Sequence, residues 1–226
     1  MSWVISPSYK DPDYSNVSLL LHGNGTNGST TITDNSPTPK TVTAVGNAQI
    51  STAQSKFGGA SIAFDGNGDY LSTPASSVFS YGTGDFTIEM WLYRIGTGQQ
   101  HLYEGRNGTT TNTILLYLNP SNTLTYYANG SIRISSGGVP AANNWSHVAV
   151  CRSATTTKLF LDGTQVGLSY TDTINYASPT SILILGTNDV GSGSYLNGYI
   201  DDLRITKGVA RYTANFIPPT APFPDI

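Results

Sequence analysis

The stretch Asp85–Tyr93, Asp-Phe-Thr-Ile-Glu-Met-Trp-Leu-Tyr, restricts the possible folds more than any other part of the sequence. Its side chains alternate strictly between an apolar set and a mixed set, and this period of two predicts a β-strand. The apolar set is Phe86, Ile88, Met90 and Leu92, and the opposite set is Thr87, Glu89, Trp91 and Tyr93. Because both sets contain large side chains, we expect one buried face and a second face that is covered or open to a ligand.

The rest of the chain repeats this pattern as short apolar runs separated by Gly, Pro, Asn and Asp. No window keeps a helical period between capping residues, so we expect almost no helix. Two tight hairpins are predicted, one over Thr41–Ser51 and one over Ser61–Ser72. Many strands without intervening helices favour an all-β sandwich, in which two antiparallel sheets pack face to face.

The length of 226 residues suits one all-β domain. We predict an N-terminal arm or linker over residues 1–17, the sandwich over 18–217 and a Pro-rich tail over 218–226. Cys151 is the single cysteine, so no intrachain disulfide can form and the fold must depend on its core. The apolar run around Cys151 predicts a buried thiol.

The charge pattern excludes several partners. Charged residues make up 11% of the chain and the net charge is −3, which gives no electrostatic basis for nucleic-acid binding. No apolar run approaches the length of a membrane span, so no membrane insertion is expected. The first residues, Met-Ser-Trp-Val-Ile-Ser-Pro, lack the basic and apolar regions of a signal peptide.

Two neighbouring acids, Asp201 and Asp202, lie inside an apolar strand near the C-terminus, which we expect to pair with an N-terminal strand. The apolar residues around them, Ile200, Leu203 and Ile205, do not fit one alternating face, which predicts a bulge or twist. Carboxylates at such a place must be solvated, hydrogen-bonded or bound to a metal. Calcium accepts oxygen ligands and is one candidate. Pairing of Asp201 with Arg204, or capping of backbone amides, is the alternative.

Aromatic and polar residues in the middle third of the chain are candidates for a ligand-binding face, because sugars bind aromatic rings with polar neighbours. The candidates are Tyr103, Arg106, Tyr117, Tyr127 and Asn129. Tyr126 and Tyr127 must point to opposite faces, so at most one of them can join this face. The alternative for any single tyrosine is packing between the sheets or under a loop, with its hydroxyl hydrogen-bonded.

Six motifs occur in a fixed order along residues 18 to 217. They are Leu-Leu-Leu-His at 19–22, Lys-Phe-Gly-Gly-Ala-Ser-Ile-Ala-Phe-Asp-Gly-Asn-Gly-Asp-Tyr-Leu at 56–71, the strand at 85–93, Asn-Trp-Ser-His-Val-Ala-Val at 144–150, Lys-Leu-Phe-Leu-Asp-Gly at 158–163 and Gly-Tyr-Ile-Asp-Asp-Leu-Arg-Ile at 198–205. Their order resembles the laminin G-like branch of the concanavalin A-like lectin/glucanase superfamily. The ending at 204–220 resembles the variant found in bacteriophage tail and structural proteins.

The resemblance implies a jelly-roll sandwich that binds glycans or other surface ligands. It also implies a structural calcium held between an N-terminal loop, here His22–Thr26, and an acid of the last strand. On this basis Asn24, Asp34 and Asp201 are the predicted metal ligands. Asn24 stands where we would expect an Asp, which lowers the charge of the site.

The sequence argues against an enzyme. Glycoside hydrolysis ordinarily needs a pair of acids, and the chain has only two glutamates, Glu89 and Glu104. The clustered acids Glu-x-Asp-x-x-Glu of the glucanase members are missing. The three histidines, at 22, 101 and 147, have no metal-binding spacing.

We therefore predict a non-catalytic adhesion module of a phage virion, tail or capsid surface that recognises a cell-surface glycan. Another extracellular setting is the alternative location. The alternative function is a structural decoration or spacer domain that contacts other virion proteins, and a polysaccharide-degrading enzyme ranks third. A homo-oligomer is compatible with the sequence, although no heptad or collagen-like segment enforces one.

Overall fold

The computed structural model describes residues 10–106, 111–135, 138–176, 184–188 and 193–226. Its described elements are two short 3₁₀ turns, η1 (Tyr14–Asn16) and η2 (Ser77–Phe79), and fifteen strands. The strands are β1 (Val17–Leu21), β2 (Thr43–Val45), β3 (Gln49–Ser51), β4 (Ser61–Asp65), β5 (Tyr70–Ser72), β6 (Phe86–Arg94), β7 (Gln100–Glu104), β8 (Ile114–Leu118), β9 (Leu124–Ala128), β10 (Ser131–Ser135), β11 (Trp145–Ser153), β12 (Thr156–Leu161), β13 (Thr164–Thr171), β14 (Ile184–Leu185) and β15 (Asn197–Lys207). Within this described part, no helix is long and apolar enough to cross a membrane.

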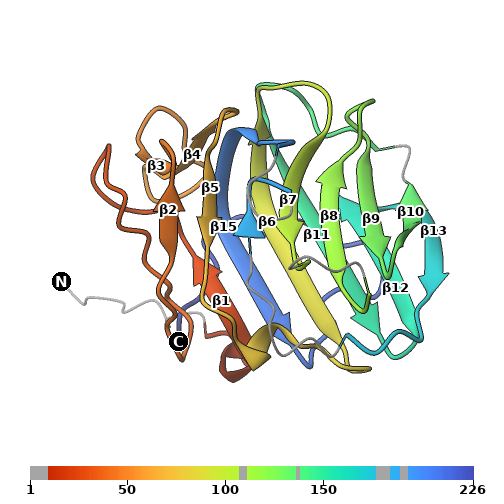
Figure 1. Cartoon of the computed structure of the whole chain (residues 1–226). Coiled ribbons are helices and arrows are strands. Elements are labelled where there is room, and N and C mark those ends of the chain that lie inside the picture. Colours follow the sequence, from red (N-terminus) through yellow and green to blue (C-terminus); the bar gives the residue numbers. More distant parts are fainter. Residues whose placement is uncertain (1–9, 107–110, 136–137, 177–183, 189–192) are drawn as a thin grey trace.

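The strands form two antiparallel sheets that lie face to face, which confirms the predicted fold class (Figure 1). The eight-stranded sheet has the order β13-β12-β11-β6-β15-β4-β3, with β1 paired to β15. The seven-stranded sheet has the order β10-β9-β8-β7-β14-β5-β2. The pairing of β1 with β15 confirms that an early strand pairs with the acidic strand.

The core lies between the sheets and confirms the faces predicted for β6. Phe86, Ile88, Met90 and Leu92 all belong to one buried hydrophobic cluster. The opposite side of β6 is also covered over most of its length, because Thr87, Glu89 and Trp91 are buried and only Tyr93 is half-exposed. We call the sheet faces that turn away from the core the outer faces.

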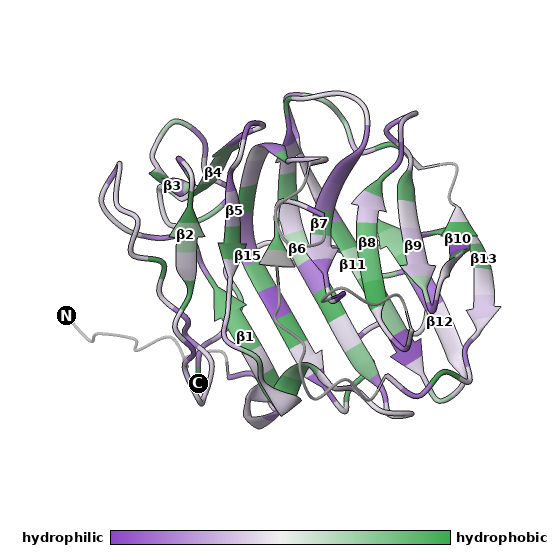
Figure 2. Ribbon diagram, in the orientation of Figure 1, coloured by the Kyte–Doolittle hydropathy of each residue, from purple (hydrophilic) through white to green (hydrophobic). Residues whose placement is uncertain are grey.

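Strand β15 contains the predicted bulge. Asp201 pairs with Trp91 and Arg204 pairs with Glu89, so two residues of β15 lie opposite one residue of β6. Asp202 adopts a positive φ of 47° at this point. The extra residue resets the alternation, and as a result Ile200, Leu203 and Ile205 all enter the core. Figure 2 shows hydrophilic residues interrupting the hydrophobic colouring of this strand.

The two predicted hairpins are wrong. Strands β2 and β5 belong to the seven-stranded sheet, whereas β3 and β4 belong to the eight-stranded sheet, so both tight turns are corners between the sheets. Asp69 joins the two corners, because its carboxylate accepts hydrogen bonds from the backbone nitrogens of Asn47 and Asp65. A turn signal in the sequence shows that the chain reverses, but it does not show whether the next strand stays in the same sheet.

The C-terminal segment crosses the outer face of the eight-stranded sheet. Tyr212 and Phe216 pack against a small cluster that contains the buried Cys151. Burial raises the pKa of the Cys151 thiol to about 12. The predicted structural role of this cysteine therefore agrees with its environment.

The described end of the predicted N-terminal arm and the predicted tail also pack on the sandwich. Phe223 of the tail is buried with Val17 and Leu20 of β1. The backbone nitrogen of Asp11 donates a hydrogen bond to the carbonyl oxygen of Ile226. Both segments therefore contribute to the folded unit.

We expect Phe223→Ala to lower the free energy of unfolding by about 3 kcal/mol, because the change removes a buried ring. Ile217→Ala is the matched control in the same tail, since Ile217 is 87% exposed and its truncation should change stability by no more than about 0.5 kcal/mol. Urea unfolding of both variants measures the difference. Equal stability of the two variants would show that the tail is not part of the cooperative unit.

Candidate functional site

Three of the predicted ligand residues lie together on the outer face of the seven-stranded sheet. Tyr117 of β8 and Tyr127 of β9 point away from the core, because their strand neighbours Leu116 and Tyr126 belong to the buried cluster. Arg106 follows the end of β7, and its guanidinium carbon lies 5.7 Å from the centre of the Tyr127 ring. The predicted residues Arg106, Tyr117 and Tyr127 therefore lie on the same outer face.

Glu104 fixes Arg106 in this position. Its Oε1 accepts hydrogen bonds from the backbone nitrogen and from Nε of Arg106, both at 2.8 Å, and its Oε2 accepts from Nη2 at 2.6 Å. Such a two-pronged pair restricts both the position and the plane of the guanidinium. His101 completes the group, with its ring centre 5.4 Å from that of Tyr117.

We name this group, His101, Glu104, Arg106, Tyr117 and Tyr127, the sheet-face cluster. Sequence reasoning missed its first two members. The only available signal was the spacing of Glu104 and Arg106, because residues two apart on an extended chain share a face. Burial raises the pKa of Tyr117, with a further contribution from Tyr127. Tyr127 is partly exposed and Arg106 is 17% exposed, so both reach the surface.

Tyr103 does not join the cluster and instead follows the alternative of a tyrosine packed between the sheets. A register shift in β7 turns its ring into the core, where its hydroxyl lies 2.9 Å from that of Tyr81. Asn129 has a different task as well. It adopts a φ of 49° in the turn between β9 and β10, and its Oδ1 accepts a hydrogen bond from the backbone nitrogen of Asn112. This hydrogen bond links the turn to the loop at Asn112, so the Oδ1 of Asn129 already accepts a hydrogen bond from the protein.

Of the three predicted calcium ligands, Asp34 is already fully hydrogen-bonded. Asp34 accepts four hydrogen bonds, from the backbone nitrogens of Leu20, Ser36 and Lys40 and from the Ser36 hydroxyl. Both oxygens of Asp34 are thus used to close a loop, and it does not fit a metal ligand. In the described ranges, no group of three His, Cys, Asp or Glu residues could hold a metal ion.

Asp201 fits a cation better. Its Oδ2 accepts hydrogen bonds from the backbone nitrogens of Lys56 and Phe57, at 2.7 and 3.0 Å, so it caps amides as in the sequence-based alternative. Its Oδ1 is buried without a hydrogen-bond partner among the described residues, and burial raises the pKa of this carboxyl to about 6. The side-chain amide of Asn24 lies against Gly58, which belongs to the same loop as Lys56 and Phe57. Calcium binding by Asp201 and Asn24 stays a prediction.

Glu89 lies on the other outer face, at the centre of a buried ionic network. Its Oε1 accepts hydrogen bonds from Nε and Nη2 of Arg204, at 2.9 and 2.8 Å, and its Oε2 accepts from the Tyr212 hydroxyl at 2.7 Å. Burial would raise the pKa of Glu89, but Arg204, His147 and Tyr212 outweigh burial and hold it at about 2. This carboxylate therefore stays charged and cannot donate a proton at neutral pH.

A family model described as the concanavalin A-like lectin/glucanases superfamily matches residues 65–211, which is more than half of the chain. No curated protein matches the sequence. Among solved structures, the binding domain of Paraclostridial Mosquitocidal Protein 1 superposes with a TM-score of 0.65 at 15% identity. That match covers 87% of this chain and 50% of the toxin domain.

Two further structures are similar. One is that of botulinum neurotoxin type C, whose cell entry depends on interaction with two ganglioside molecules, with a TM-score of 0.63, 16% identity and coverage of 87% of this chain and 49% of that one. The other is domain 4 of AbnA, an extracellular arabinanase from Geobacillus stearothermophilus, in complex with arabinotriose. It has a TM-score of 0.62, 16% identity and coverage of 86% and 94%. The chain spans about half the length of the toxin domains. At these low identities, the structural similarity shows a shared fold.

The Asp201→Asn variant tests the calcium prediction. The folded pKa of about 6 lies above the ordinary value of 3.8, so protonated Asp201 stabilises the fold, and this contribution is lost as the pH rises through 6. At pH 7.5 in EDTA, Asp201→Asn should therefore raise the stability by about 2 kcal/mol, because the amide keeps an acceptor for Lys56 and Phe57 without a charge. At pH 4 the gain should vanish.

With calcium present, Asp201→Asn would lower the stability relative to the unsubstituted chain, because the ion binds only the folded protein that keeps the Asp201 carboxylate. We expect millimolar calcium to raise the melting temperature of the unsubstituted chain and to leave Asp201→Asn unchanged. Differential scanning fluorimetry with and without EDTA measures both effects. A melting temperature that does not respond to calcium at pH 7.5 would rule out the predicted site.

Proposed function

The chain belongs to the concanavalin A-like lectin/glucanase superfamily, and we propose that it is a non-catalytic module that binds a glycan through the sheet-face cluster. One observation carries this proposal: Arg106, fixed by Glu104, lies beside Tyr127 at the surface of the sheet. A tyrosine ring can stack on the apolar face of a sugar. A guanidinium of fixed orientation can donate hydrogen bonds to its hydroxyl groups.

The similar structures support the chemical class of this ligand. The neurotoxin relative interacts with gangliosides, and the arabinanase domain was solved with arabinotriose, which are both glycans. The arabinanase domain is the closer model for size, because the match covers 94% of its chain. For the present chain, glycan binding rests on the sheet-face cluster, since the likeness to these structures extends only to the fold.

The state of the two glutamates supports a role without catalysis. A glycosidase needs an acid whose pKa is raised far enough to protonate the leaving group. Glu89 has a pKa of about 2 and is bound by Arg204. Burial would raise the pKa of Glu104, but Arg106 and His101 lower it overall. Both glutamates are therefore held in the wrong protonation state for a general acid. Asp201, whose pKa is raised to about 6, is fully buried and does not reach the surface where a substrate would bind.

The proposal also assigns the protein a biological location. The resemblance of residues 204–220 to endings of phage tail and structural proteins favours a virion surface, where a glycan-binding module would attach the particle to a cell. A decoration domain that contacts only other virion proteins is the second candidate. A glycan array distinguishes them: a defined hit supports attachment, whereas no hit together with tight binding to a virion protein supports the structural role.

Tyr127→Ala should weaken binding of the best array glycan at least tenfold, because the loss of a stacked ring and its apolar contact costs about 1.4 kcal/mol or more. Arg106→Ala should have an effect of similar size. Tyr199→Ala is the matched control, since Tyr199 is a half-exposed tyrosine on the opposite sheet. Isothermal titration calorimetry measures the affinities. Unchanged affinity in both cluster variants, with normal melting temperatures, would place the site elsewhere.

A further inference from the structure

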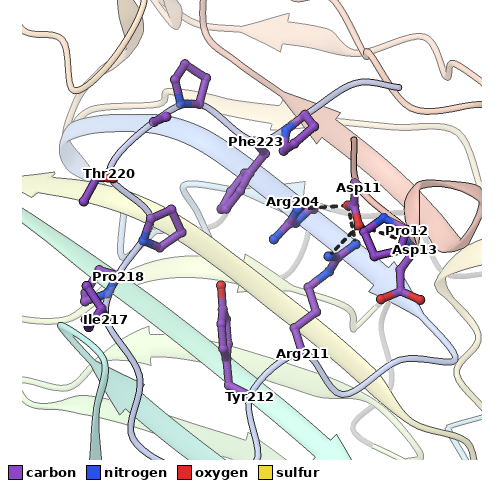
Figure 3. Close-up of a pocket in the computed structure, with 14 residues that line it drawn as sticks. Asp11, Pro12, Asp13, Arg204, Arg211, Tyr212, Ile217, Pro218, Thr220 and Phe223 are labelled. Atoms are coloured by element: carbon purple, nitrogen blue, oxygen red, sulfur yellow. Dashed lines mark hydrogen bonds and ion pairs between the residues drawn. The ribbon is translucent and has the colours of Figure 1, made fainter. Parts of the chain in front are cut away.

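A second candidate site lies on the opposite side of the sandwich, where the C-terminal segment arches over the outer face of the eight-stranded sheet (Figure 3). It is a pocket of about 610 Å³, within the roughly 300–1,000 Å³ typical of ligand sites. Its lining comes from three parts of the chain: residues 11–13, Arg204 of β15, and the C-terminal residues 211–212 and 217–224.

The floor of this pocket is a rigid charged frame. Asp11 lies between two guanidiniums and accepts hydrogen bonds from Arg204 Nη1 at 3.0 Å and from Arg211 Nη1 and Nη2 at 3.0 and 2.7 Å. The ring of Phe223 covers Arg204, whose guanidinium carbon lies 3.8 Å from the ring centre. Figure 3 shows these groups facing the pocket from different segments. A frame held by so many bonds presents its polar groups without reorganisation.

The wall formed by the tail is rich in acceptors and poor in donors. Four of its eight residues between 217 and 224 are prolines, which have a carbonyl oxygen but no N–H group. The backbone N–H of Phe223 already donates to Asp202 at 2.7 Å. Such a wall suits a ligand that carries many donors, as the hydroxyl groups of a sugar do.

An aromatic ring and the apolar parts of the prolines complete the chemistry. Tyr212 lines the pocket and stacks on Phe216 with parallel rings, at a centre-to-centre distance of 3.5 Å and an angle of 5°. That contact occupies one face of the Tyr212 ring and fixes its orientation. The proline rings supply further apolar C–H surface, so the pocket can contact the apolar face of a sugar as well as its hydroxyl groups.

The charges of the frame decide which sugars fit. Arg204 and Arg211 are balanced by Asp11 and Glu89, with which they form ion pairs. Asp13 adds one further carboxylate to the lining. Since no positive charge remains in excess, an anionic sugar or a phosphate would meet an unfavourable potential. A neutral ligand avoids this repulsion.

We infer that this pocket is a second saccharide site, which takes a short neutral oligosaccharide between Tyr212, Arg211 and the proline-rich tail. The inference extends the proposed glycan recognition to the opposite sheet and uses no residue of the sheet-face cluster. The two sites can therefore fail separately in an experiment.

Filling the pocket tests the inference without disturbing its charged frame. Ala221 is exposed and lines the pocket, so the indole of Ala221→Trp would occupy the space of the ligand. Ala214→Trp is the matched control, because Ala214 is exposed on the same C-terminal segment outside the pocket lining. Asp13→Asn removes the extra carboxylate and tests the preference for neutral sugars.

The probes are arabinotriose, a neutral trisaccharide, and trigalacturonate, an acidic one, titrated by calorimetry into the whole chain with Tyr127→Ala in place to silence the sheet-face cluster. We expect arabinotriose to bind this background and the Ala214→Trp variant equally, and at least tenfold more weakly when Ala221→Trp is present. Trigalacturonate should bind at least tenfold more weakly than arabinotriose. Asp13→Asn should reduce this difference in affinity between the acidic and the neutral trisaccharide.

Three results would overturn the inference: no arabinotriose binding in the Tyr127→Ala background, equal binding in the two tryptophan variants, or tighter binding of trigalacturonate. Melting temperatures within a few degrees of the parent confirm that each variant is folded. If Tyr127→Ala abolishes all binding while the parent chain binds, the proposed function stands and the second site fails. If only Ala221→Trp weakens binding, the second site stands and the sheet-face cluster fails.

Discussion

The ion pair between Glu89 and Arg204 organises the outer face of the eight-stranded sheet. It exists because the bulge in β15 turns Arg204 outward, directly opposite Glu89 on β6. Both side chains are buried, so the loss of one partner would leave an unpaired charge and cost about 3–5 kcal/mol. Asp11 and Tyr212 attach to the same pair, and through them the chain around residue 11 and the C-terminal segment are held on the sheet.

The regular part of the fold could be predicted from the sequence because it follows from a period of two. The faces of β6 and the bulge beside Asp201 follow from the placement of apolar residues. The partnership of β1 with β15 could be expected because the acidic strand lies near the C-terminus and needs an earlier strand as its partner. The corners could not be predicted. Whether a chain turns back within a sheet or crosses to the facing sheet depends on contacts outside the turn itself, such as the hydrogen bond that joins Asn47 to Asp69 of the other corner.

The candidate sites were less predictable than the fold, since each depends on one local irregularity. A register shift in β7 moves Tyr103 into the core, although strict alternation would allow it on the surface. Asp34 has the chemistry of a metal ligand, but its loop uses both oxygens for hydrogen bonds. The pocket over the opposite sheet combines residues almost 200 positions apart, Asp11 and Arg204, and no local pattern links them.

The single cysteine gives the molecule a built-in probe of its own opening. Cys151 lies beneath Tyr212 and Phe216, and its thiol remains protonated at neutral pH because burial raises its pKa to about 12. A thiol reagent can reach it only when the C-terminal segment lifts or the whole domain unfolds. The rate at which Cys151 is labelled therefore reports how often the C-terminal segment, which forms one wall of the pocket, moves away from the sheet. A ligand bound in the pocket would slow the labelling of the Cys151 sulfur without contacting it.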